Sequence, residues 1–289
     1  IVKEVPVKRI IAAFAMLAIV AFVVSGEGAQ EQAGEKLTLT WSTASVPGDA
    51  HTEAIPVVKA ELEKLSGGTM TIDYYHSGQL FSQNDDQNAA MMGKVDMVYS
   101  SAAWLAQHVP TMSMFAAAFT FQSYTQMTKT FNGPTGDKVF EQALKLGYRP
   151  LMAYYLGTRQ LNLTEKVGPI TKPEQMKNVK FRVPNAPAWI AMGKALGANP
   201  TPMAFGEVYM GLKTGVIDGQ DNPLPTDQAA KFYEVTKYIV LTSHVVDSVW
   251  PSINEKRWQG LSKKQQGWLM KALEKGREFC DTTNLKKEE

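Results

Sequence analysis

Arg182 and Arg159 are the two side chains whose type and position would suit the binding of an anion. In KNVKFRVPNAP (177–187), apolar residues alternate along one face of a predicted strand, and Lys180 and Arg182 share the opposite face. Pro184 ends this strand because proline has no backbone N–H to donate to a neighbouring strand. The pattern alone leaves two alternatives. Arg182 either points into water, as a charge on a polar strand face usually does, or lies at the strand end and grips an anion.

Strands and helices alternate along the chain, which predicts an α/β fold. Between residues 37 and 101 the order is strand, helix, strand, helix, strand, and this order implies a parallel sheet with crossover helices. Ligands in open α/β sheets bind beyond the carboxyl ends of strands, where Arg159 follows one predicted strand and Arg182 ends another. The predicted strands are 37–45, 69–75, 95–101, 148–157, 179–184 and 216–223; the predicted helices are 51–68, 85–94, 125–133, 136–147, 187–198, 207–215 and 262–279; residues 231–243 run from helix into strand.

Motifs of several enzyme classes are missing from the sequence. It has no Walker loop, no GxGxxG after a strand, no HExxH and no GxSxG. Adjacent Asp85 and Asp86 would not face each other on a helix, and they are interpreted as a solvated helix start. Cys280, the only cysteine, falls in the last predicted helix, where a catalytic role is not expected. No metal site is expected, because the four histidines are scattered without ligand spacing at His51, His76, His108 and His244.

The composition is that of an ordinary globular protein. Of 289 residues, 44% are hydrophobic and 20% are charged, which suits one large domain or two smaller ones. A net charge of +2 is no signature of nucleic-acid binding, so no nucleic-acid partner is expected. A single cysteine excludes an internal disulfide framework.

The N-terminal residues have the pattern of a secretory signal peptide. Lys8 and Arg9 precede the apolar run 10–24, and small and polar residues follow it. A membrane anchor is the alternative, but this run is shorter than the roughly 20 apolar residues that a span needs. We therefore predict a signal peptide over residues 1–29 and export to the periplasm.

A run of motifs between residues 154 and 244 resembles one protein family. YYLGTRQLN, KFRVPNAP, LGANPTPMAFGEVYMGLKTGVIDGQDNP and KFYEVTKYIVLTSH follow in this order, after SGQL at 77–80 and GKVDMVYSS at 93–101. Together they resemble the periplasmic solute-binding proteins of tripartite ATP-independent periplasmic (TRAP) transporters, the DctP-like family. The similarity covers roughly residues 36 to 280.

The resemblance implies a two-domain periplasmic-binding-protein fold of the α/β class, type II-like, with hinge strands and a long connecting helix. Domain I is expected at 36–157 plus 247–289, and domain II at 158–246. The resemblance also implies further helices beyond Glu289, where this sequence stops.

The site residues implied by the resemblance lie within its motifs. Arg182 matches the family arginine that pairs with a substrate carboxylate, and a planar guanidinium suits a carboxylate because two parallel hydrogen bonds join them. Arg159 matches a second, assisting arginine. Asn222 matches an asparagine that bonds polar groups of the ligand, and Phe205 an aromatic that packs on it.

The sequence departs from the family pattern in YSSAAWL. Members that bind sialic acid carry acidic and basic residues there, whereas this chain has Ser101 and Trp104, which argues against sialic acid. Trp104 and Trp189 would make the cleft more apolar or belong to the core. Position 81 is Phe where the family usually has Gly.

These observations favour a solute-binding protein that captures a small organic acid by hinge closure and delivers it to a TRAP permease. A C4-dicarboxylate, a sugar acid or a related carboxylate would serve as ligand. The protein would be a monomer without cofactor and without enzymatic activity. Two alternatives remain open at this point, a secreted α/β enzyme and a binding protein of an ATP-driven importer or a sensor.

Overall fold

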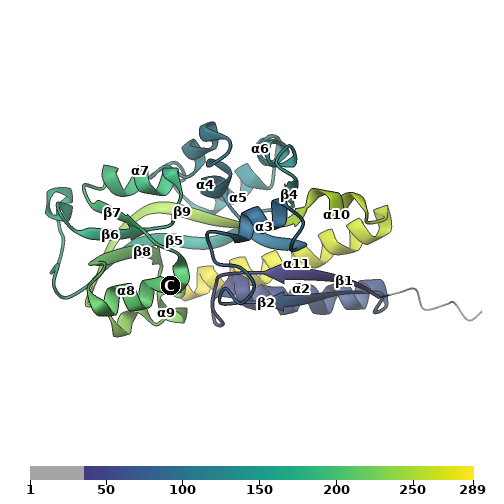
Figure 1. The fold of residues 1–289 in the computed structure, drawn as a ribbon, viewed down its shortest axis with the longest axis horizontal. Coiled ribbons are helices and arrows are strands. Elements are labelled where there is room, and N and C mark those ends of the chain that lie inside the picture. Colours follow the sequence, from purple (N-terminus) through teal and green to yellow (C-terminus); the bar gives the residue numbers. More distant parts are fainter. Residues whose placement is uncertain (1–35) are drawn as a thin grey trace, which may run out of the picture. The chain divides into compact units, whose positions relative to one another are not determined.

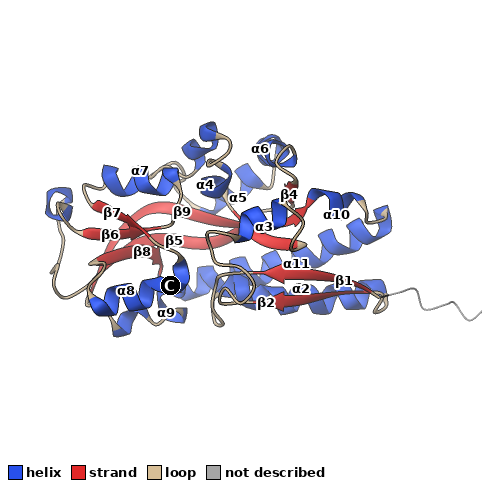
Figure 2. Ribbon diagram, viewed as in Figure 1, coloured by secondary structure: helices blue, strands red, loops and turns tan. Residues whose placement is uncertain are grey.

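The computed structural model describes residues 36–289, so the predicted signal peptide lies outside the described residues. Its centre is a nine-stranded sheet in the order β2-β1-β3-β9-β5-β8-β6-β7, with β4 paired to β9 (Figure 2). Helices pack on this sheet, which confirms the predicted α/β class.

The first part of the sheet, here called sheet half 1, is mainly parallel. Strand β1 lies between β2 and β3 and runs parallel to both, as the strand-helix order predicts. Helices α2 and α3 make the two crossovers. Sheet half 1 comprises β1 (Leu37–Ser42), β2 (Met70–Tyr75), β3 (Met97–Ser100), β4 (Tyr148–Pro150) and the end of β9 (Tyr238–Asn254); its crossovers are α2 (Ala50–Ser66) and α3 (Asp86–Met91).

The second part, sheet half 2, contains the strands that carry the predicted arginines. Strand β5 pairs antiparallel with β9 on one side and with β8 on the other, and β6 runs parallel to β8 and β7. Sheet half 2 comprises β5 (Tyr154–Leu163), β6 (Lys180–Val183), β7 (Asn199–Pro202), β8 (Gly219–Pro223) and the start of β9.

Strands β5 and β9 pass through the middle of the molecule (Figure 1). Strand β9 pairs with β5 at its start and with β3 and β4 at its end, so one strand belongs to both sheet halves. The prediction of a single strand over 148–157 is wrong, because the chain leaves the sheet at 151–153 and β5 then continues to Leu163. Arg159 therefore lies inside a strand and not after one.

Gly157 allows β5 to pass close to β8. Its φ is +130°, and a Cβ there would lie 2.5 Å from the Cβ of Pro223. Only glycine combines this φ with this close approach at low cost. The pairing of β5 with β9 shifts register beside this residue, between Tyr155 and Gly157.

A long C-terminal helix joins the two parts of the fold. Helix α11 packs against α2 in one apolar core and extends toward α9 (Figure 1). It begins at a capping box formed by Ser262 and Gln265 and runs nine residues beyond the predicted end at 279. The remaining helices are α4 (Ala102–Leu105), α5 (Tyr124–Phe131), α6 (Pro134–Leu144), α7 (Pro187–Ala195), α8 (Val208–Thr214), α9 (Leu224–Ala229), α10 (Glu255–Gln259), α11 (Lys263–Glu288), and the short 3-10 helices η1 (Pro110–Phe115), η2 (Pro173–Met176), η3 (Phe205–Glu207) and η4 (Phe232–Glu234).

Within residues 36–289, no helix has both the length and the apolar character required to cross a bilayer. The assignment of domain I to 36–157 plus 247–289 and of domain II to 158–246 stays a prediction.

Candidate functional site

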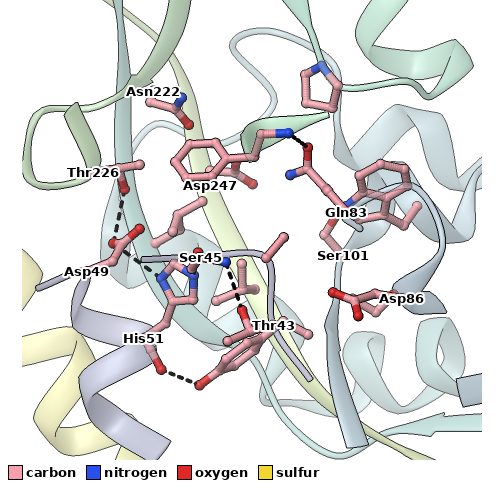
Figure 3. A pocket seen from close by; sticks show the side chains of 18 of the residues that line it. Thr43, Ser45, Asp49, His51, Gln83, Asp86, Ser101, Asn222, Thr226 and Asp247 are labelled. Atoms are coloured by element: carbon pink, nitrogen blue, oxygen red, sulfur yellow. Dashed lines mark hydrogen bonds and ion pairs between the residues drawn. The ribbon is translucent and has the colours of Figure 1, made fainter. Parts of the chain in front are cut away.

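A cavity of about 100 Å³ is lined by residues from both sheet halves (Figure 3). Its lining contains every side chain that the sequence assigned to a ligand site. These six residues come from β5, β6, β8, η3 and the start of α4, and they are Arg159, Arg182, Asn222, Phe205, Ser101 and Trp104.

Arg182 is a buried cation without a carboxylate partner among the described residues. Only 1% of it is exposed. Its Nε donates to the Met203 carbonyl (2.9 Å), and one terminal nitrogen donates to Oε1 of Gln83 (2.8 Å). Burial, together with the nearby charge of Arg159, lowers the pKa of Arg182 to about 9. The strand face of Arg182 therefore meets this cavity and not bulk water.

Arg159, in contrast, is neutralised by two carboxylates of the protein. Its Nε donates to Asp221 (2.6 Å), and another nitrogen donates to Asp247 (3.0 Å). The guanidinium also lies over the ring of Trp189, 4.4 Å from its centroid. Arg159 thus lines the cavity with most of its hydrogen-bonding capacity already used inside the protein.

Asp221 pairs with Arg159 and is not itself part of the cavity lining. It is fully buried, and its Oδ2 also accepts from Nε2 of His244 at 3.2 Å. Burial alone would raise the pKa of Asp221, but the charge of Arg159 and the bond to His244 outweigh burial and hold this pKa well below its usual range. The carboxylate is therefore ionised at neutral pH.

Asn222 and Phe205 complete the wall contributed by sheet half 2. The side-chain amide of Asn222 donates to Oε1 of Gln220 at 2.5 Å. The Phe205 ring packs edge-on against Phe232, and Arg182 lies 6.0 Å from its centroid. Both side chains are buried, so their positions are set by packing as well as by hydrogen bonds.

Gln83 belongs to the cavity although sequence reasoning did not single it out. It lies in the loop between β2 and α3, and its Oε1 accepts from both Arg182 and the backbone N–H of Phe205, at 2.8 and 3.0 Å. One side-chain amide from sheet half 1 therefore contacts two groups of sheet half 2. The approach of this loop to β6 comes from tertiary structure, and no local pattern signals it.

Asp86 corrects the interpretation of Asp85-Asp86 as a solvated helix start. Asp85 is exposed, but Asp86 is only 6% exposed and lines the cavity. Its Oδ1 accepts from Oγ of Ser42, 2.6 Å away on β1. Burial raises the pKa of Asp86 to about 7.

A second polar group missed by sequence reasoning lies at the start of α2. Nδ1 of His51 is 3.4 Å from Oδ1 of Asp49, and Nε2 of His51 is 2.5 Å from Oγ of Ser45. Asp49 also accepts from Thr226 of α9 at 3.2 Å. The position just after the first strand could have signalled these residues, because it is where open sheets bind ligands.

The part of the chain that the structure describes contains no group of three His, Cys, Asp or Glu side chains that could hold a metal ion. The lining combines the guanidinium of Arg182 with neutral hydrogen-bonding side chains, and this combination suits a small organic molecule with an anionic group and hydrogen-bonding groups.

Asp227, on α9 next to the site, makes a testable contribution to stability. It accepts from Gln220 (2.7 Å) and Asn162 (3.2 Å), yet burial raises its pKa to about 8. The folded protein therefore binds this proton more tightly than the unfolded chain does. Ionisation of Asp227 therefore lowers the free energy of unfolding as the pH rises from about 4 through 8, whereas below about pH 4 this group does not destabilise the fold.

Asp227→Asn removes that charge and keeps an acceptor oxygen. At about pH 9 we expect the variant to have a free energy of unfolding that is higher than that of the parent protein by roughly 2 kcal/mol or more. Between about pH 5 and pH 9, the free energy of unfolding should fall less in the variant than in the parent protein. Urea unfolding at the two pH values measures this, with the exposed Asp85→Asn as control. An unchanged pH slope would contradict the assignment.

The sequence matches one protein family over most of its length. Residues 42–289 match DctP, described as bacterial extracellular solute-binding protein, family 7. The chain belongs to this family. The resemblance to the DctP-like proteins of TRAP transporters is thereby confirmed.

Several relatives of this chain are described as periplasmic proteins. The chain is 31% identical over 239 residues to the sialic acid-binding periplasmic protein SiaP of Vibrio cholerae, which covers 82% of this chain and 74% of that protein. It is 35% identical over 216 residues to the 2,3-diketo-L-gulonate-binding periplasmic protein YiaO of Escherichia coli, which covers 74% of this chain and 65% of that protein. The chain spans about two thirds of the length of the curated relatives it matches.

Solved structures of the family share the fold. A TRAP periplasmic solute-binding protein of Roseobacter denitrificans with bound 3-deoxy-D-manno-oct-2-ulosonic acid has a TM-score of 0.82 and 38% identity, covering 88% of this chain and 83% of that one. The sugar acid-binding protein DctPAm of Advenella mimigardefordensis with galactonate has a TM-score of 0.83 and 25% identity, covering 88% and 81%. The predicted periplasmic-binding-protein fold is confirmed.

Family membership also decides the class of protein. The family consists of solute-binding proteins, so the expectation of a binding protein and not an enzyme is confirmed. The names of the relatives support a periplasmic location.

Proposed function

We propose that this protein captures a small organic acid in the cavity between the two sheet halves and delivers it to the membrane permease of a TRAP transporter. The ligand carboxylate pairs with Arg182. Asn222, Phe205, Ser101 and Trp104 contact the rest of the ligand, and Arg159 supports the site by fixing the surrounding charges. This division of roles rests on the geometry of the two arginines.

One observation carries the proposal. Arg182 is buried beside the cavity without a carboxylate among the described residues, whereas Arg159 has two. A buried guanidinium that lacks a counter-charge is unfavourable, and a ligand carboxylate would supply that charge with two parallel hydrogen bonds.

The ligands named for the relatives support the same chemistry. The bound molecules include 3-deoxy-D-manno-oct-2-ulosonic acid, galactonate and succinate, and each is a carboxylic acid. For this chain, the candidate ligands are therefore a C4-dicarboxylate, a sugar acid or a related carboxylate.

Capture would follow the mechanism of a hinged trap. Strands β5 and β9 and helix α11 join the two parts of the fold, so bending in them would open and close the cavity. The proposed protein is exported by its N-terminal signal peptide and acts as a monomer. Its membrane partner uses an ion gradient to drive transport. Ligand transport by the reconstituted permease, driven by an ion gradient without ATP, would distinguish this role from that of a binding protein for an ATP-driven importer or a sensor.

A thermal-shift screen of organic acids tests the proposal. A ligand at about 100 times its Kd adds roughly 2.7 kcal/mol to the free energy of unfolding, which raises the Tm by about 5–10 °C for a chain of this size. The amide of each acid is the matched control, because it lacks the negative charge. Equal shifts with acid and amide would rule out carboxylate recognition.

A further inference from the structure

Strand β5 crosses from sheet half 1 to sheet half 2 at residues 155–158. Tyr154 packs in the apolar core of sheet half 1, whereas Leu161 packs in that of sheet half 2. The pairing of β5 with β9 shifts register within the crossing, between Tyr155 and Gly157. Bending of this short segment would therefore move one sheet half relative to the other.

The C-terminal end of α11 binds the backbone at both ends of this crossing (Figure 1). Oδ1 of Asp281 accepts from the backbone N–H of Tyr155 at 2.7 Å, and the side-chain amide of Asn284 donates to the Tyr155 carbonyl at 2.8 Å. Oε1 of Glu288 accepts from the backbone N–H of Thr158 at 2.5 Å. Asp281, Asn284 and Glu288 are spaced by three and four residues, so they share one face of the helix.

Glu288 bridges the glycine of the crossing. Its Oε2 accepts from the hydroxyl of Tyr155 at 2.5 Å, while its Oε1 binds Thr158. Gly157 lies between these two partners, and a Cβ there would lie 2.8 Å from Oε1 of Glu288. Glycine permits wide changes of φ and ψ, but rotation at Gly157 would move Tyr155 relative to Thr158 and strain at least one of the two bonds. Glu288 therefore favours the backbone angle seen in this structure.

The backbone angle that Glu288 favours belongs to an arrangement in which the two sheet halves touch across the cavity. Gln83, in the loop after β2, accepts from Arg182 and from the backbone N–H of Phe205. Glu288 itself is not part of the cavity lining. A change at Glu288 would therefore alter the fraction of closed molecules without removing a contact to a bound acid.

We propose that Glu288 is a positioning residue that stabilises the closed arrangement and thereby sets the affinity for the ligand from outside the cavity. The effect on affinity rests on the proposed function, because it requires that an acid is captured in this cavity. When only the closed state binds tightly, the apparent Kd is the intrinsic Kd divided by the closed fraction. Loss of the two Glu288 bonds would weaken binding by the factor by which that fraction falls.

Single-molecule fluorescence energy transfer measures the closed fraction without any ligand. Dyes on Gln79→Cys, after β2, and on Lys213→Cys, in α8, report the distance between the sheet halves, because both positions are exposed and outside the lining. Cys280 is buried and does not compete for the dye. We expect Glu288→Ala to lower the ratio of closed to open molecules about tenfold. Glu289→Ala, which removes the same charge from the exposed next residue, should leave the ratio unchanged.

Calorimetry with 3-deoxy-D-manno-oct-2-ulosonic acid provides the second readout. Glu288→Ala should raise the Kd about tenfold, and Tyr155→Phe, which removes one of the two bonds and keeps the ring, should raise it less. A merely structural role would lower the Tm but leave the closed-to-open ratio and the Kd as in the parent protein, and that result would overturn the inference. If the parent protein binds neither this acid nor any other acid of the thermal-shift screen, the proposed function fails, whereas the closed-to-open ratio still decides the role of Glu288.

Discussion

Replacing Arg182 by alanine is expected to weaken the binding of an organic acid by at least about 100-fold while the protein remains folded. Arg182 is the only group in the lining that is both positively charged and without a carboxylate partner among the described residues. Truncating one partner of a buried, hydrogen-bonded charge pair typically costs about 2–5 kcal/mol. Calorimetric titration of Arg182→Ala with the acid that gives the largest thermal shift measures this loss.

The same substitution should affect stability little when no ligand is added. Burial of the charged group lowers the pKa of Arg182 to about 9, which means that holding this cation inside the folded protein costs free energy at neutral pH. Alanine removes that cost and also removes two hydrogen bonds, to Met203 and Gln83. The two effects oppose each other, so the Tm should change by only a few degrees.

Two further variants separate charge from shape at position 182. Arg182→Met keeps most of the side-chain volume without charge, and it should bind as weakly as the alanine variant. Arg182→Lys keeps the charge but cannot form two parallel hydrogen bonds with a carboxylate, so it should be intermediate. Wild-type affinity in Arg182→Met would show that the acid is held elsewhere.

The sequence predicts the location of Arg182 more fully than its surroundings. Alternation places it opposite Phe181 on β6, and that assignment of faces agrees with the structure. What lies against the polar face depends on Gln83, which is distant along the chain. Strand periodicity describes which side a residue faces, but it cannot say whether that side meets water or a loop.

The long strand β9 shows why element boundaries are harder to predict. The sequence indicates a strand only as far as residue 243, whereas β9 continues to Asn254. Two residues of β9 have features that are typical of strand ends. Ser243 adopts a φ of +46°, and Pro251 has no backbone N–H to donate to a neighbouring strand. Pairing with β5, β3 and β4 overrides these local signals.

Tertiary contacts also explain the break before β5. The side chain of Asn132 accepts from the backbone N–H of Ala153 and donates to its carbonyl, at 2.8 and 2.9 Å. These bonds satisfy the backbone where it leaves the sheet. Asp86 is a similar case, because its partner Ser42 is 44 residues away and no spacing rule links them.

Asp221→Ala is expected to reduce the free energy of unfolding by about 3–5 kcal/mol at neutral pH. The substitution leaves Arg159 buried with one fewer carboxylate and leaves His244 without its bond to that carboxylate. For a chain of this length the Tm should fall by roughly 10 °C. Asp73→Asn, at an exposed position on β2, is the control for the change in net charge.

The pH dependence of the Asp221 contribution has a definite sign. Because the pKa of this carboxyl is depressed in the folded protein, its contribution is present above the ordinary pKa of 3.8 and is lost as the pH falls below it. The parent protein should therefore lose stability toward acid more steeply than Asp221→Ala does. Urea unfolding at about pH 7 and pH 3 measures both slopes, and equal slopes would contradict the depressed pKa.

A triple substitution decides whether the ion pairs of Arg159 stabilise the fold or only pre-arrange the site. Arg159 pairs with both Asp221 and Asp247, so all three charges have to be removed together. Replacing a whole buried ionic group by neutral side chains is often nearly neutral, whereas removing one partner leaves an uncompensated charge. Arg159→Met combined with Asp221→Ala and Asp247→Asn should therefore be more stable than Asp221→Ala alone. If the triple variant also binds the acid more weakly than the parent protein, the Arg159 group contributes to affinity although its charge is already paired. If affinity is retained, Arg182 alone accounts for recognition of the carboxylate.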